Sequence, residues 1–167
     1  MTVMDLKPLS AKSIPGALEK AKHYRLLNEP SAAESICLDV LRVDPGNQEA
    51  LIVLILAMSD HLGATYKICD QNVEDLLKQL ESEYEREYYA GLVAERRGLA
   101  KLRSQNPGSG YVAYECFTTA MAYYEKAIGL SRSSGGEATL RWNTCARLIE
   151  RNNLAPRERE HLAELGD

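Results

Sequence analysis

Hydrophobic side chains recur along most of the chain at the three- and four-residue spacing of an α-helix. In the stretch 17–27, Ala17, Ala21, Tyr24 and Leu27 fall on one stripe, and charged residues occupy most of the other positions. Strand-like alternation of polar and apolar residues does not persist anywhere along the chain. The pattern therefore predicts an all-α fold.

Turn-forming residues divide the chain into about seven or eight predicted helices. Asp44-Pro45-Gly46 is the clearest boundary, because proline cannot continue the hydrogen-bond ladder and glycine tolerates the turn. We expect Ser31 to cap the second helix. The third helix, 48–61, is apolar on almost every side, so other helices should cover it. The remaining helices are predicted at about 65–82, 84–102, 111–130 and 137–151, followed by a short one beginning at Pro156.

The composition is that of a single folded domain: 45% of the 167 residues are hydrophobic and 26% are charged. The net charge of −4 argues against nucleic-acid binding. Four basic residues within a short stretch keep RNA binding open as an alternative: Arg96, Arg97, Lys101 and Arg103. The longest apolar run, 50–58, is far shorter than the roughly 20 residues that cross a membrane. With no secretory signal pattern at the N-terminus, we expect a cytoplasmic protein that does not bind membranes.

No set of residues has the spacing of a catalytic or metal site. The four cysteines lie about 30 or more residues apart, so we expect neither a zinc site nor a redox dithiol. Serine-nucleophile signatures and phosphate-binding glycine loops are missing, and we therefore expect no enzyme, no metal and no cofactor. A small-ligand or enzymatic pocket near Asp60, His61 and Tyr88 is kept as an alternative.

Residues 14–47 resemble one tetratricopeptide repeat over its full length. Ala21 and Ala33 stand where this family places small residues at the contact between paired helices, and Tyr24 stands at the position of a packing aromatic. Val43-Asp44-Pro45-Gly46-Asn47 matches the family's closing turn. The third and fourth predicted helices resemble a second, degenerate repeat.

A third repeat is similar to the family's pattern from Tyr88 onwards, but the signature of its second helix arrives about 17 residues late. We interpret 99–119 as an insertion that lengthens both helices. Trp142 lies in a lone final helix, which we expect to cap the array. The predicted organisation is a flexible segment 1–13, a repeat domain 14–151 and a short C-terminal helix within 152–167.

The resemblance implies a right-handed superhelix of antiparallel helix pairs, whose first helices line a concave groove for a peptide or partner helix. Carried over by register, the groove residues are Leu18, Lys22, Arg25, Ile52, Leu56, Asp60, Tyr88, Leu92, Glu95, Arg96 and Trp142. Co-chaperone relatives grip a carboxylate with a lysine–asparagine clamp, which Leu18 and Lys22 do not reproduce.

The leading interpretation is a protein–protein adaptor. A secretion-type chaperone is an alternative, suggested by three repeats, an acidic balance and the apolar third helix. Homodimerisation through the long, tyrosine-rich hairpin is a further possibility. The chain has nine tyrosines, and those of the hairpin either line a binding groove or cover helix joints.

Overall fold

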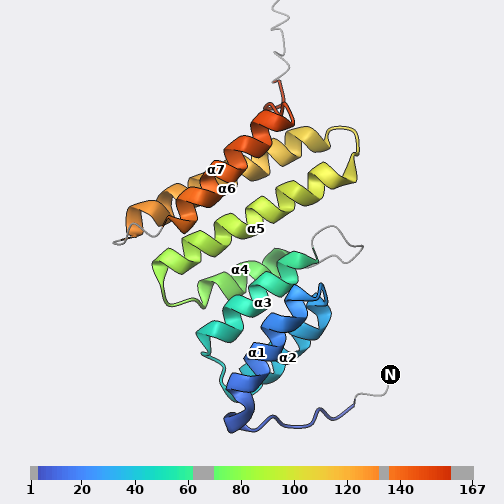
Figure 1. Cartoon of the computed structure of the whole chain (residues 1–167), viewed down its shortest axis with the longest axis vertical. Helices are drawn as coiled ribbons and strands as arrows, with labels where there is room; N and C mark the ends of the chain where they lie inside the picture. The colour runs from blue at the N-terminus through green and yellow to red at the C-terminus, as the bar shows by residue number, and fades with distance from the viewer. Residues whose placement is uncertain (1–3, 62–69, 132–135, 159–167) are drawn as a thin grey trace, which may run out of the picture.

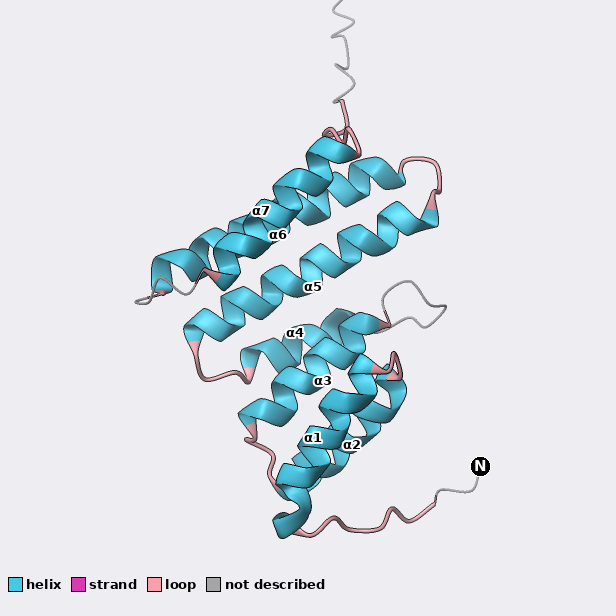
Figure 2. Ribbon diagram, in the orientation of Figure 1, coloured by secondary structure: helices cyan, strands magenta, loops and turns pink. Residues whose placement is uncertain are grey.

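The computed structural model describes residues 4–61, 70–131 and 136–158. These residues form helices without any strand, which confirms the predicted all-α class (Figures 1 and 2). A short 3₁₀ helix, Ala11–Ser13, precedes the α-helices. They are α1 (Ile14–Leu26), α2 (Pro30–Val43), α3 (Gln48–Asp60), α4 (Asp70–Lys78), α5 (Glu83–Ser104), α6 (Ser109–Leu130) and α7 (Glu137–Arg151).

Local chemistry explains several of the helix boundaries. The Asn47 side chain accepts a 2.9 Å hydrogen bond from the amide of Ala50 at the start of α3, and Ser82 caps α5 in the same way. The prediction that Ser31 caps the second helix is wrong. That helix begins at Pro30, before Ser31; the fixed φ of proline suits the first helical turn, and no side chain caps the helix.

The two ends of the chain are described only in part. The predicted C-terminal segment, 152–167, is described only over 152–158, and these residues form no helix. The chain turns at Asn153, which has a φ of +48°, and then continues without regular structure. Residues 159–167, like the predicted helix start at 65–69, lie outside the described residues. At the other end, Leu9 packs against the hydrophobic core beneath α1.

The helices stack along the long axis of the molecule. Consecutive helices pack against each other, and the odd-numbered helices α1, α3, α5 and α7 also contact one another in that order (Figure 1). Helix α3 therefore has neighbours on several sides, and Leu51 and Ile55 are no more than 1% exposed. The expectation that other helices cover α3 is confirmed.

The most extensive contact joins α5 and α6, each 22 residues long. Two glycines of α5, seven residues apart, receive two aromatic rings of α6. A Cβ placed on Gly91 would lie 2.7 Å from the ring of Tyr124, and one on Gly98 would lie 2.7 Å from the ring of Phe117. Both rings are fully buried, so the two glycines allow this close approach. Both helices are long, and the interpretation of 99–119 as an insertion stays a prediction.

Candidate functional site

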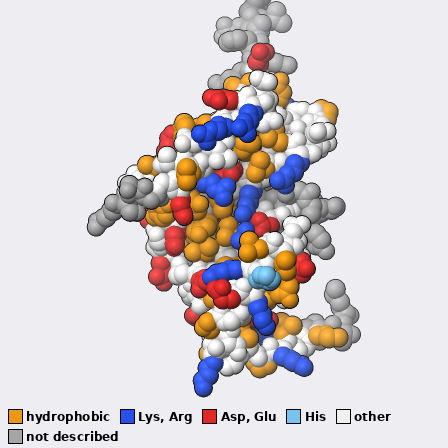
Figure 3. All heavy atoms as spheres, viewed as in Figure 1, with side chains coloured by type: hydrophobic (Ala, Val, Ile, Leu, Met, Phe, Trp, Pro, Cys, Tyr) orange, Lys and Arg blue, Asp and Glu red, His pale blue; other side chains and the backbone are white. Residues whose placement is uncertain are grey.

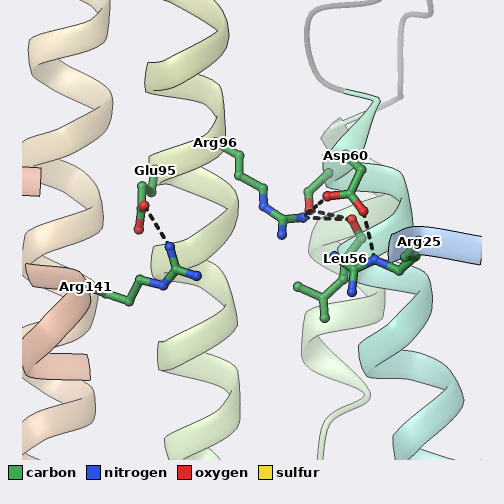
Figure 4. A network of polar contacts seen from close by, with 7 residues as sticks. Arg25, Leu56, Asp60, Glu95, Arg96 and Arg141 are labelled. Carbon is green, nitrogen blue, oxygen red and sulfur yellow. Dashed lines mark hydrogen bonds and ion pairs between the residues drawn. The ribbon is translucent and has the colours of Figure 1, made fainter. Parts of the chain in front are cut away.

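Polar contacts tie the odd-numbered helices to one another, and the first centres on Asp60 at the end of α3. Its carboxylate accepts a 2.8 Å hydrogen bond from Nε of Arg25 on α1 and lies 2.6 Å from Nη1 of Arg96 on α5 (Figure 4). The same Arg96 nitrogen donates to the Leu56 carbonyl at 2.9 Å and to the Ser59 hydroxyl. We call these five residues the Asp60 cluster; it connects three helices.

Two guanidinium groups share one carboxylate in the Asp60 cluster. Burial lowers the pKa of Arg96, and the positive charge of Arg25 lowers it further, while Asp60 opposes both effects. The side chains of Arg25, Asp60 and Arg96 are 20%, 23% and 22% exposed. Arg25 and Arg96 were expected to offer positive groups to a partner. The structure instead uses both to hold helices together.

Lys22 is also engaged within the chain. Its ammonium group contacts Glu19, one turn away on α1, and Glu49 at the start of α3. Hydrogen bonds to these two carboxylates raise the pKa of Lys22. The three predicted cations of the groove thus all have acidic partners in the same molecule.

A second polar cluster lies on the other side of α5, around the buried Glu95. One carboxylate oxygen accepts a 2.7 Å hydrogen bond from the hydroxyl of Tyr124 on α6, and the other accepts a 3.2 Å bond from Arg141 on α7 (Figure 4). Burial raises the pKa of Tyr124, and its hydrogen bond to Glu95 adds to that effect. Burial alone would lower the pKa of Arg141, but Glu95 and a hydrogen bond to Tyr88 raise it overall.

Three of the predicted groove residues do not face solvent. Leu18, Leu92 and Glu95 are 3%, 4% and 2% exposed, so the prediction that they line an open groove is wrong. The reason, for Leu18 and Glu95, is that each turns toward a neighbouring helix. Leu18, for example, packs against Val40 of α2 and Ala50 of α3.

The partly exposed apolar residues of the predicted set are Ile52, Leu56 and Tyr88. Tyr88 stacks on Tyr84, with ring centroids 5.9 Å apart and planes inclined by 11°, and it meets Tyr89 edge to face. Because the tyrosines pack on one another and still expose part of their surface, packing and binding remain compatible roles for them.

Trp142 is partly exposed at the far end of the predicted set. Its indole N–H donates a 3.0 Å hydrogen bond to Glu125 of α6, and its ring packs against the core formed by α5, α6 and α7. The residue therefore joins α7 to α6.

The pocket proposed near Asp60, His61 and Tyr88 is not assembled from those residues. Tyr88 packs against Tyr84 and against Tyr124 of α6. It precedes Arg96, the α5 partner of Asp60, by eight residues, a separation of about 12 Å along a helix. The His61 ring instead faces α2, 3.4 Å from the Ser31 hydroxyl and 3.8 Å from the Glu34 carboxylate.

Sequence reasoning missed Ser59, Glu49 and Arg141 as members of these contacts. The sequence predicted the helix that contains Arg141, which directly precedes Trp142. It did not predict that the carboxylate partner of Arg141 would be Glu95 on α5. Across the described ranges, no group of three or more potential metal ligands comes together, and no helix is long and apolar enough to cross a membrane.

Comparisons with protein-family models, with characterised proteins and with solved structures found no match to this chain.

Proposed function

We propose that the chain is a protein-interaction module of tetratricopeptide type, which binds a peptide or a helix on the side formed by its odd-numbered helices. The observation that carries this proposal is the order of helix contacts. The helices α1, α3, α5 and α7 each contact the next odd-numbered helix, as the first helices of successive repeats do.

The chemistry of this side supports the same proposal. Ile52 and Leu56 of α3 and Tyr88 of α5 are partly exposed, and tyrosine is one of the residues enriched among those that contribute most binding energy at protein interfaces. Figure 3 shows hydrophobic side chains gathered at mid-height on the side that faces the viewer, with basic and acidic groups around them. The Asp60 and Glu95 clusters lock the relative positions of α1, α3, α5 and α7, so a partner would meet a preorganised surface.

Site-specific photo-crosslinking tests the proposal. A benzophenone amino acid is placed at Ile52 or at Tyr88, and in a control at Leu38, which is 48% exposed on α2. We expect a discrete crosslinked partner from positions 52 and 88 and none from position 38. An identical product from all three positions, or none from the first two, would contradict the proposed binding side.

A further inference from the structure

A second candidate site lies in a hollow between the beginning of α1 and the middle of α2, and it is independent of the side proposed above. Its volume is about 450 Å³, within the usual range of ligand pockets. We call it the α1–α2 hollow. It is lined by Leu9, Lys12, Ser13, Gly16, Ala17, Lys20, Ile36 and Asp39.

The hollow faces away from the odd-helix contacts. Ser13, Gly16, Ala17 and Lys20 follow the i, i+3, i+4, i+7 spacing of one helical stripe. Lys22, which contacts α3, stands two residues beyond Lys20 and therefore lies on roughly the opposite side of the helix. A ligand in the hollow would leave the odd-helix side free.

The absence of a side chain at Gly16 helps to create the space. A Cβ built on Gly16 would meet no atom within 4 Å, so the residue borders open volume. The apolar part of the lining comes from three residues: Leu9 and Ala17 are anchored in the core near Leu18, and Ile36 packs against the core between α1, α2 and α3. The hollow thus offers a supported apolar surface large enough for one bulky side chain.

Two lysines, Lys12 and Lys20, place positive charge at the rim of the hollow. Lys12 and Lys20 are exposed, and within the described part of the chain neither forms an ion pair. They differ in this from Lys22, Arg25, Arg96 and Arg141, which all contact carboxylates. Asp39 supplies one acceptor on the α2 side of the hollow.

We propose that the α1–α2 hollow binds an acidic peptide segment by taking up one bulky apolar side chain, with flanking carboxylates at Lys12 and Lys20. A peptide fits better than a small molecule because the hollow is open to solvent. A chain lying across the mouth buries the inserted side chain and brings charges to both lysines, and its backbone amides can donate to Asp39.

The test uses the full chain labelled with ¹⁵N and the fluorescein-labelled peptide Asp-Glu-Trp-Glu-Asp. We expect saturable shifts of the amide signals of Gly16, Ala17 and Ile36 at peptide concentrations up to about 1 mM. The peptides Lys-Arg-Trp-Arg-Lys and Asp-Glu-Ala-Glu-Asp should bind at least about tenfold more weakly, because the first reverses the charge and the second removes the inserted side chain.

Two variants locate the binding site. Gly16→Leu places a side chain in the hollow, where an added Cβ meets no atom within 4 Å, and should weaken binding about tenfold or more. Its matched control is Gly129→Leu, since Gly129 is also a helical glycine with nothing within 4 Å of an added Cβ. The double variant Lys12→Ala, Lys20→Ala should weaken binding about fivefold, whereas Lys101→Ala, at an exposed lysine of α5, should not change it.

Four results would overturn the proposal. They are no saturable shift up to about 1 mM peptide, equal binding of the charge-reversed peptide, unchanged binding by Gly16→Leu, or equal loss in its Gly129 control.

The occupant could also come from this protein itself. A mass in light scattering that falls to a monomer only in Gly16→Leu would assign the hollow to a second copy. The double variant Met4→Glu, Leu6→Glu is measured without peptide. If it shifts the amide signal of Gly16, the exposed N-terminal segment is the occupant of the hollow.

Discussion

Two glycines of α5 allow its close contact with α6. Gly91 and Gly98 each face a fully buried aromatic ring of α6, and their seven-residue spacing matches that of Tyr124 and Phe117. A helical glycine ordinarily costs about 1 kcal/mol relative to alanine. Here that cost is offset by the packing of two large rings directly on the α5 backbone.

We predict that Gly98→Ala destabilises the protein by about 1–2 kcal/mol, because overpacking against the ring of Phe117 outweighs the gain in helix propensity. Urea unfolding measures the change. Gly129→Ala is the control, since an added Cβ there meets no atom and the free energy of unfolding should stay unchanged or rise slightly. Equal stabilisation by both substitutions would show that α5 and α6 have room for a side chain at this contact.

At the scale of the helices, the contact between α3 and α5 depends strongly on the Asp60 cluster. The Arg96 side chain reaches from α5 to the last turn of α3, where it donates to the Leu56 carbonyl and the Ser59 hydroxyl. Asp60 adds the connection to Arg25 on α1. The cluster thus joins α1 and α3 to the α5–α6 hairpin, and it does so with side chains that are only about one-fifth exposed.

We predict that Asp60→Ala lowers the free energy of unfolding by about 1–2 kcal/mol, since two partly buried guanidinium groups would then face each other without a carboxylate. Glu19→Ala is the matched control: Glu19 is 73% exposed, and Lys22 keeps its contact with Glu49, so the change should stay below about 0.5 kcal/mol. Hydrogen exchange should increase in the last turn of α3 only in the first variant. Equal effects of the two substitutions would mean that the cluster contributes no more than a surface ion pair.

The same clusters show where sequence reasoning succeeded and failed at the level of elements. The positions of α3, α5, α6 and α7 followed from apolar periodicity and turn residues, to within about two residues at each end. The direction in which Leu18, Leu92 and Glu95 point did not follow. A register inherited from a repeat assumes regular helix crossings, and the long α5–α6 hairpin and short α4 depart from that regularity.

At the scale of the whole molecule, stability depends on ionisable groups in each part of the helix stack. Cys37 lies between α1, α2 and α3, and Cys145 lies between α5, α6 and α7. Both side chains are fully buried, and burial raises the pKa of each thiol from 9.0 to about 12. Burial likewise raises the pKa of Tyr89 to about 12.

We predict that stability is lost in alkaline solution because of these shifts. Below pH 9 the thiols are protonated in both states, so their contribution is fully present; between pH 9 and 12 only the unfolded chain ionises. Each thiol then lowers the free energy of unfolding by up to about 1.4 kcal/mol per pH unit. In urea unfolding from pH 8 to 11, Cys145→Ala should show a shallower decline than the wild type. An identical pH dependence of the two proteins would exclude a contribution from this thiol.

The sequence by itself determined the helices and their order, because periodicity and turn chemistry act over a few neighbouring residues. It also indicated that α5 and α6 are long helices. Only the tertiary structure decided which charges are available to a partner. Arg25 and Arg96 meet at Asp60, and Glu95 meets Tyr124 and Arg141. The hydrogen-bonded partners lie 29 to 46 residues apart in the sequence. Such pairings depend on how helices cross, which no local pattern of residues specifies.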